Sequence, residues 1–334
     1  MSETMLEVRD LSKQFVKRLD LAARLAQRLG ADIREEVVHA VDKVSISIAP
    51  GEVVGLVGES GCGKSTIGRM IAGILEPTSG EIIYKGQSLG QMSQDEAKAT
   101  ALQIQMIFQD PFASLNPRMR VQDIIGEAPV MHGVVRRDQV ADYVEDVMRR
   151  VGLDPEYRRR YPHQFSGGQR QRIGIARALA VKPEFLVCDE AIAALDVSIQ
   201  AQVINLFIDL REDLDLTYLF ISHDLSVVEH ISDRVVIMYL GRVVEIAPTD
   251  EIFESPNHPY TQALLAEVPR LDMRGLDYQP ISGEIPSPLD PPPGCHFHPR
   301  CPHATARCRA EAPVLKEIAP GRWSACHLND GGAA

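Results

Sequence analysis

One stretch of the sequence decides the fold: it reads Gly58-Glu-Ser-Gly-Cys-Gly63-Lys64-Ser65-Thr66. A continuous apolar segment, Val53–Val57, precedes it and predicts a buried strand. After it, from Ser65 to Ile74, apolar residues recur at helical spacing. Strand, glycine-rich loop and helix therefore follow one another in the order of a nucleotide-binding α/β unit.

The loop matches the pattern G-x-x-x-x-G-K-[ST], in which each residue type has a physical role. Glycines let successive N–H groups converge on a phosphate, and the start of the following helix adds a partial positive charge. Lys64 is expected to pair with β- and γ-phosphate oxygens, and Ser65 to bind Mg²⁺. A chance match is disfavoured because a strand and a helix flank the loop. The candidate ATP-binding residues here are Gly58, Ser60, Gly61, Cys62, Gly63, Lys64, Ser65 and Thr66.

Two carboxylates, Asp189 and Glu190, end a second apolar segment, Phe185–Cys188. Read alone, such a pair belongs most often to a solvated loop. In a chain with a phosphate-binding loop, this position suits a carboxylate that holds Mg²⁺ through water and a second that polarises the attacking water. We therefore assign Asp189 to magnesium and Glu190 to catalysis.

Further strands alternate with helical segments, which implies parallel crossovers. The predicted strands are Leu6–Val8, Val41–Ile48, Thr217–Ile221 and Val235–Met238, and the stretch from about 110 to 166 is helical. A lone histidine is more often a surface residue, but His223 follows an apolar strand that would carry it to the γ-phosphate edge of the sheet.

Composition restricts the class of protein. The chain has 334 residues and a net charge of -11, which argues against nucleic acid as a partner. No secretory signal and no apolar run of about 18 residues is visible. The expected location is therefore cytoplasmic, with membrane attachment through another protein.

Several motifs together resemble the ABC ATPases. The segment Phe165-Ser-Gly-Gly-Gln-Arg-Gln171 is similar to the signature sequence of that family, with Phe165 where leucine is commoner. Gln109 resembles the glutamine of the Q-loop, Ala194-Leu-Asp196 the D-loop, and His223 the switch histidine. Phe15 resembles the aromatic residue that stacks on adenine.

The resemblance implies an ABC-type P-loop ATPase cassette, a mixed α/β sheet with a helical subdomain. It also implies that the signature covers the γ-phosphate bound by a partner cassette, so that ATP lies between two subunits. The residues expected to act on the partner's ATP are Ser166, Gly167, Gly168, Gln169 and Asp196. Glu190 and His223 would be catalytic, and Gln109 would join Ser65 and Asp189 at the magnesium ion.

Segments outside these motifs are similar to the oligopeptide/dipeptide importer ATPases. They are 109–118, 195–202, 259–265 and 294–302. This resemblance implies a subunit that energises peptide import through two transmembrane permease subunits, served by an extracytoplasmic solute-binding protein, from the cytoplasmic face of the membrane. Relatives of this subfamily also import nickel, opines or oligosaccharides. The partner cassette is either a second copy or a different ATPase subunit.

The composition changes near Glu254, where proline becomes dense and regular structure should become sparse. We place a cassette at 1–254 and a small irregular, cysteine-rich extension at 255–334. Four cysteines of the extension could hold a [4Fe–4S] cluster, as the resemblance implies, and free thiols are the alternative. Those cysteines are Cys295, Cys301, Cys308 and Cys326. Zinc is a further alternative, with His296, His298 or His327 as substitute ligands.

Two features depart from the family pattern. Residues Val16–Val38 form an insertion in which leucines four apart alternate with arginines. We expect a surface helix at the sheet edge, and a membrane-binding or partner-binding helix is the alternative. Ala191 follows Glu190 where proline is usual, which leaves the rate of hydrolysis open.

Two other functions compete with transport. A soluble ABC ATPase of translation or DNA repair would usually carry two cassettes or long coiled-coil insertions, whereas this chain has one cassette and no long heptads. A P-loop kinase or GTPase would lack the segment Ser166–Gln169.

Overall fold

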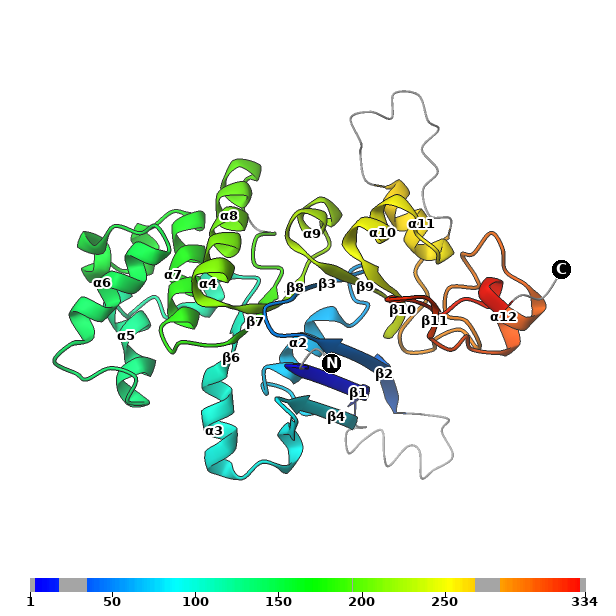
Figure 1. The fold of residues 1–334 in the computed structure, drawn as a ribbon, viewed down its shortest axis with the longest axis horizontal. Coiled ribbons are helices and arrows are strands. Elements are labelled where there is room, and N and C mark those ends of the chain that lie inside the picture. Colours follow the sequence, from blue (N-terminus) through cyan, green and yellow to red (C-terminus); the bar gives the residue numbers. More distant parts are fainter. Residues whose placement is uncertain (1–3, 18–34, 194, 268–282, 331–334) are drawn as a thin grey trace, which may run out of the picture.

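The computed structural model describes residues 4–17, 35–193, 195–267 and 283–330 (Figure 1). Two sheets form the framework. The larger has eight strands in the order β11-β12-β10-β9-β3-β8-β7-β6, and β9, β3, β8, β7 and β6 run parallel. Their bounds are β3 Val53–Val57, β6 Ile104–Ile107, β7 Phe185–Asp189, β8 Thr217–Ile221, β9 Arg234–Tyr239, β10 Arg242–Pro248, β11 Lys316–Ala319 and β12 Arg322–Ser324.

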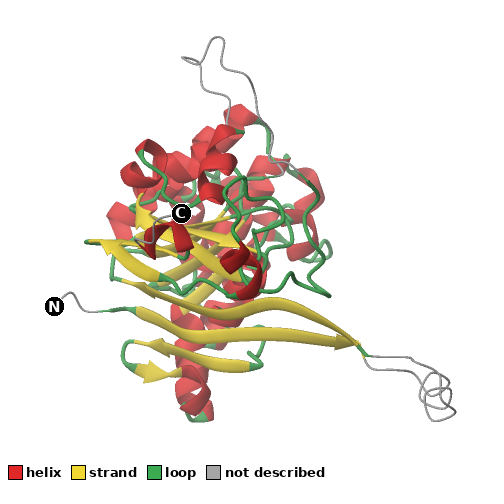
Figure 2. Cartoon of the chain, turned by 90° about the vertical axis from the view of Figure 1, so that its right-hand side faces the viewer, coloured by secondary structure: helices red, strands yellow, loops and turns green. Residues whose placement is uncertain are grey.

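A four-stranded antiparallel sheet lies beside it, in the order β2-β1-β4-β5 (Figure 2). Its strands are β1 Leu6–Lys17, β2 Glu36–Ile48, β4 Ser79–Tyr84 and β5 Gln87–Ser88. The architecture is thus the mixed α/β sheet that the resemblance implied.

Helices cover both faces of the parallel strands. Their bounds are α2 Lys64–Ile71, α3 Gln94–Gln103, α4 Pro111–Ser114, α5 Val121–Met131, α6 Val140–Arg150, α7 Gly167–Leu179, α8 Val197–Leu214, α9 Leu225–Ile231, α10 Thr249–Glu254, α11 Pro259–Ala266 and α12 Ala306–Ala310. Helices α5 and α6, from the stretch predicted to be helical, gather with α7 at one end of the molecule (Figure 1); the bounds of the helical subdomain remain a prediction.

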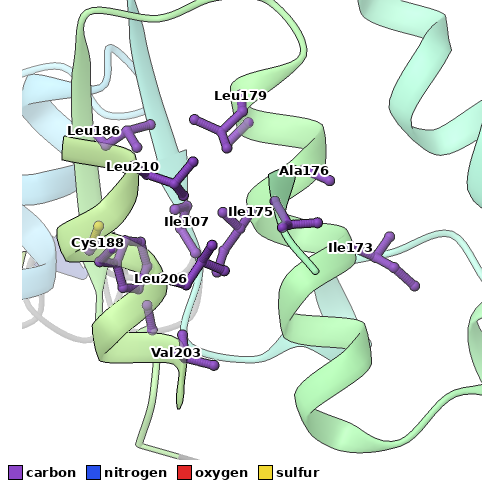
Figure 3. Packing of buried hydrophobic residues seen from close by; sticks show 14 of the residues in the cluster. Ile107, Ile173, Ile175, Ala176, Leu179, Leu186, Cys188, Val203, Leu206 and Leu210 are labelled. Atoms are coloured by element: carbon purple, nitrogen blue, oxygen red, sulfur yellow. The ribbon is translucent and has the colours of Figure 1, made fainter. Parts of the chain in front are cut away.

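The parallel strands are apolar throughout because both of their faces are buried. In β7, Leu186 and Cys188 face the core shared with α7 and α8, whereas Phe185 and Val187 face α2 and the antiparallel sheet. Figure 3 shows side chains of α7 and α8 converging on Ile107 and Leu186. The strand that ends at Asp189 is therefore held from both sides.

Several predicted boundaries were wrong. β1 is longer than the predicted Leu6–Val8, and β2 begins before Val41, because the two strands pair along most of their length. The helix expected over Val16–Val38 is wrong at both ends, where the residues belong to β1 and β2, and residues 18–34 lie outside the described part of the chain.

The C-terminal region packs on the cassette rather than standing apart. β12 pairs with β10, and Phe297 lies in one core cluster with Tyr239 and Tyr260. Regular structure is sparse over 283–293, as the prolines predicted. The boundary at Glu254 remains a prediction.

In the described ranges, no helix is long and apolar enough to cross a membrane.

Phe207→Ala should destabilise the chain by about 3–5 kcal/mol, because the ring is fully buried and a cavity would remain. Phe207 packs edge-to-face on Tyr218 and Phe220. Denaturant unfolding measures the change. Val197→Ala, at a side chain that is 81% exposed, is the control and should stay within about 0.5 kcal/mol of the natural chain.

Candidate nucleotide-binding site

The glycine-rich loop joins β3 to α2, as the sequence predicted. At two positions of the loop only glycine fits, because the backbone of a neighbouring strand lies too close for a Cβ atom. A Cβ atom on Gly58 would lie 2.2 Å from the carbonyl oxygen of Met238, and one on Gly63 would lie 2.2 Å from that of Ala40. Gly63 also has a φ of 107°, which favours glycine. The loop is therefore wedged between β9 and β2.

Lys64 begins α2 and is only 4% exposed. Its Nζ donates to the carbonyl oxygens of Gly58 and Glu59, at 2.7 and 3.1 Å. The ammonium thus lies within the curve of the loop, where a phosphate oxygen could replace a carbonyl as its acceptor. Ser60, Gly61 and Cys62 lie in the same loop, and Thr66 lies in the first turn of α2.

Ser65 and Asp189 meet although 124 residues separate them. The Ser65 hydroxyl donates to Asp189 Oδ1 at 2.6 Å. Burial raises the pKa of the Asp189 carboxyl above its ordinary value, and the bond from Ser65 opposes that rise. Two oxygen ligands of the type that Mg²⁺ prefers therefore adjoin one another at the start of α2.

Glu190 lies between Gln109 and His223. Gln109 Nε2 donates to Glu190 Oε2 at 2.6 Å, and His223 Nδ1 lies 3.4 Å from Glu190 Oε1. The three residues follow β6, β7 and β8, whose carboxyl ends meet at one edge of the sheet. The structure thus brings together three side chains that the sequence assigned to one site.

The turn after β7 has alanine, not proline, at position 191 and is restrained by other contacts. Glu190 has a φ of 46°, an uncommon conformation for a residue with a side chain, and its N–H donates to Ile221 O at 3.0 Å. Ala191 and Ile192, which follow, are buried. Packing and this hydrogen bond restrain the turn where a proline ring would otherwise do so.

Phe15 lies near the exposed end of β1. Its side chain is 42% exposed, its strand partner is Val38, and the Lys13 ammonium lies 5.3 Å from the ring centroid. Val38 is two residues before Ala40, whose carbonyl faces the loop. An exposed aromatic face therefore occurs on the sheet that borders the loop.

The signature segment forms the start of α7. Ser166 caps the helix: its Oγ accepts from the N–H of Gln169 at 3.3 Å, and its N–H donates to Gln169 Oε1 at 3.1 Å. A Cβ atom on Gly168 would lie 2.5 Å from Ile199 of α8, the helix that Asp196 caps. Ser166, Gly167 and Asp196 are exposed, so this helix start faces outward.

The four cysteines of the C-terminal region lie in one lobe with β11, β12 and α12. All four are free and partly buried, and the Cys295 N–H donates to the Cys308 carbonyl at 2.8 Å. The pKa of Cys295 is raised to about 11, mainly by burial and in smaller part by the charges of Cys308, Cys301 and Cys326. The thiols are therefore close enough to affect one another's charge.

Among the residues that the structure describes, no three His, Cys, Asp or Glu side chains are grouped in an arrangement that could hold a metal ion. The three histidines considered as zinc ligands have other neighbours. His296 Nδ1 lies 3.0 Å from Leu240 O, His298 Nδ1 2.9 Å from Cys295 O, and His327 Nε2 3.0 Å from Glu311 O.

Two residues contact the loop although no sequence pattern indicated that contact. Tyr260 and Arg300 come from the C-terminal region and bind Glu59, more than 200 residues away along the chain. Only a contact made by tertiary folding reveals them.

Asp189→Asn should raise the thermal unfolding midpoint of the nucleotide-free chain at neutral pH, because an amide is less costly to bury than a carboxylate and still accepts from Ser65. Burial raises the folded pKa above 3.8, so the ionised group destabilises the fold above that pKa and has no such effect below about pH 3.8. The gain should therefore shrink as pH falls.

Calorimetry from pH 7 downward measures the gain. The exposed Asp250→Asn is the control. A midpoint for Asp189→Asn at or below that of the natural chain at pH 7 would contradict the prediction.

Comparison with known proteins agrees with these observations. Residues 41–193 match the family model described as ABC transporter, and residues 244–308 match the one described as oligopeptide/dipeptide transporter, C-terminal region. The oligopeptide transport ATP-binding protein AppF of Bacillus subtilis (strain 168) is 51% identical over 330 residues, which cover 98% of each chain.

Solved structures show the same cassette. The structure of cbiO1 from Clostridium perfringens, part of the ABC transporter complex cbiONQ, has a TM-score of 0.62, 26% identity, and coverage of 76% of this chain and 92% of its own. The dimeric structure of MJ0796, a bacterial ABC transporter cassette, has a TM-score of 0.61, 25% identity, and coverage of 73% and 99%. The chain therefore belongs to the ABC transporter family, among the ATP-binding subunits of the oligopeptide/dipeptide transporter type.

Proposed function

We propose that this chain hydrolyses ATP at a site shared with a second ABC ATPase subunit and so energises the import of oligopeptides or dipeptides. The observation that carries the proposal is the contact of Glu190 with Gln109 and His223. These three side chains converge at the sheet edge where the phosphate-binding loop also ends.

The loop would hold the triphosphate. Its N–H groups and the start of α2 favour negative charge, and Lys64 would exchange its carbonyl acceptors for β- and γ-phosphate oxygens. Phe15 would stack on adenine.

The adjoining Ser65 and Asp189 oxygens fit a magnesium ion, with Gln109 as a further oxygen ligand. When bound, Mg²⁺ would neutralise charge on the β- and γ-phosphates.

Glu190 would orient and polarise the water that attacks the γ-phosphate. The carboxylate is only 14% exposed, and Gln109 and His223 restrict its orientation. General-base assistance of this kind contributes about 10²–10⁴-fold to a rate. His223 would contact the γ-phosphate from the neighbouring strand.

The exposed start of α7 would complete the partner's site. Ser166, Gly167, Gly168 and Gln169 present a helix start to the outside, and Asp196 adjoins them through α8. Because both half-sites are intact in one chain, two copies can pair with one another, and a related ATPase subunit can also take the partner's place.

A groove on the helical subdomain would receive the permease. It has a volume of about 580 Å³, and Met119, Glu127 and Met131 are among its lining residues. It lies on the helices that follow Gln109, so permease motion and the catalytic site would be linked through one segment. Two permease subunits would hold the ATPase pair at the cytoplasmic face of the membrane and receive solute from an extracytoplasmic binding protein.

Peptide is the proposed solute because the resemblance covers the C-terminal region as well as the cassette. Identification of the solute bound by the partner receptor tests this choice. If the receptor binds nickel, an opine or an oligosaccharide, the proposed ATPase mechanism stays the same and only the proposed solute changes.

Glu190→Gln should reduce ATP turnover about 10²–10⁴-fold while ATP binding persists, because the amide keeps the shape but cannot accept the water's proton. Bound ATP that is not hydrolysed should then hold two cassettes together as a dimer. Phosphate release, nucleotide titration and size-exclusion chromatography with ATP measure these three effects, and peptide uptake by the reconstituted transporter should be lost.

Glu229→Gln, at an exposed position of α9, is the matched control and should hydrolyse ATP as the natural chain does. ATP turnover at the natural rate in Glu190→Gln would show that Glu190 does not polarise the attacking water.

We also propose that Cys295, Cys301, Cys308 and Cys326 hold a [4Fe–4S] cluster, which needs four thiolate ligands. Supporting this proposal, the four thiols share one lobe, and His296, His298 and His327 each have another neighbour. The thiols would have to move closer together to bind metal. The role would be structural, since the lobe is small and carries little apolar core.

Cys301→Ser should abolish the brown colour and the iron content of anaerobically purified protein, because one of four ligands is lost. Metal and sulfide analysis checks this outcome. Cys188→Ala, at a cysteine remote from the lobe in β7, should keep the iron. Natural protein that contains zinc without iron, or no metal, contradicts the cluster.

A further inference from the structure

The second residue of the phosphate-binding loop, Glu59, is bound by the C-terminal region through two independent contacts. One partner is Tyr260 in α11, and the other is Arg300, which directly precedes Cys301. Neither partner belongs to the cassette motifs. The loop shape therefore depends on residues that fold in from the far end of the chain.

Arg300 and Glu59 form a two-point ion pair. Arg300 Nη1 lies 2.8 Å from Glu59 Oε2, and Nη2 lies 3.0 Å from Oε1. The Arg300 side chain is 4% exposed and that of Glu59 is 18% exposed. Two parallel bonds between planar groups fix orientation as well as distance, so the pair restricts where Glu59 can lie.

Tyr260 holds the backbone at the same residue. Its hydroxyl accepts from the Glu59 N–H at 3.0 Å. The ring is fully buried, with its centroid 4.7 Å from that of Tyr239 and 5.3 Å from that of Phe297. The loop is thus bonded to a residue of a packed, buried aromatic cluster.

Charge gives the ion pair a second effect. Glu59 places a carboxylate in a loop whose task is to hold the negative phosphates of ATP, beside Lys64, which bonds the Glu59 carbonyl. Unpaired, this carboxylate would repel the nucleotide and attract the Lys64 ammonium away from it. Arg300 neutralises it at contact distance.

We propose that Arg300 and Tyr260 are positioning residues for ATP: together they hold Glu59 so that the loop fits the phosphates, and Arg300 cancels its charge. The inference rests on the proposed nucleotide site. It assigns the C-terminal region a part in nucleotide binding in addition to any role in holding metal.

Arg300→Met should weaken binding of a fluorescent ATP analogue to the full chain about tenfold, because it leaves the Glu59 carboxylate unpaired and partly buried. In the reconstituted transporter, KM for ATP should rise while kcat stays within about twofold, since no group that contacts the reacting water is altered. Unchanged affinity and KM would overturn the proposal.

The double variant Glu59→Gln with Arg300→Met distinguishes charge from packing. It removes the unpaired carboxylate, so affinity should return to within about threefold of the natural chain. Arg300→Lys, which keeps the charge and loses the two-point geometry, should fall between the natural chain and Arg300→Met. Affinity that stays as weak in the double variant as in Arg300→Met would overturn the electrostatic part.

If Arg300→Met does not fold, Tyr260→Phe tests the proposal instead. This change removes only the hydroxyl and leaves the buried ring in place. The Glu59 N–H would lose its acceptor, and KM should rise about threefold. A KM equal to that of the natural chain would contradict the anchoring role.

Arg234→Met is the matched control. Arg234 forms a similar two-point pair with Glu52, at 2.8 and 3.1 Å, at the opposite end of β3. The Arg234→Met variant should lower the thermal unfolding midpoint without raising KM for ATP. An equal rise of KM in Arg234→Met would mean that general destabilisation, not loop positioning, explains the Arg300 result.

Lys64→Ala separates the two proposals. It should abolish analogue binding if the loop holds the triphosphate. If Lys64→Ala still binds the analogue, both the nucleotide site and this inference are overturned. If Lys64→Ala loses binding and Arg300→Met binds with the affinity of the natural chain, the inference alone is overturned.

Discussion

The carboxyl edge of the parallel strands is the constraint on which the rest of the structure depends. β8 lies between β3 and β7 and is hydrogen-bonded to both, so the loop after β3, His223 after β8 and the Asp189–Glu190 pair after β7 emerge at one edge of the sheet. The bond from Ser65 to Asp189 joins two of these segments directly. A site assembled in this way needs strands that are buried on both faces, because a shift of one strand would move a whole group of site residues.

The C-terminal region depends on the same framework and also contributes to it. Its strands extend the large sheet through the pairing of β12 with β10, and its buried Phe297 joins Tyr239 of β9. Through Tyr260 and Arg300 it reaches the loop after β3. A segment that composition marked as separate thus packs against the phosphate-binding loop. The residue that pairs with Glu59 of that loop, Arg300, directly precedes Cys301 of the cysteine lobe.

Much of the fold and site could be predicted because the signals are local. The strand–loop–helix at Val53–Ile71, the carboxylates after β7 and the cap of α7 at Ser166 each follow from short patterns. Predictions failed where pairing between distant segments decides the outcome. β1 and β2 are longer than predicted because they pair with each other along most of their length.

By itself, the sequence predicted the strand–loop–helix around Gly58–Thr66, the helix start at Ser166 and the two carboxylates that end an apolar strand, because each is a short run of residue types whose chemistry depends on neighbours in sequence. Only the tertiary structure decided that Glu190 contacts Gln109 and His223, and that Arg300 reaches Glu59 across 241 positions. The reason is physical: ion pairs and hydrogen bonds between distant residues form only after packing has brought their strands and helices together, and no local pattern records that packing.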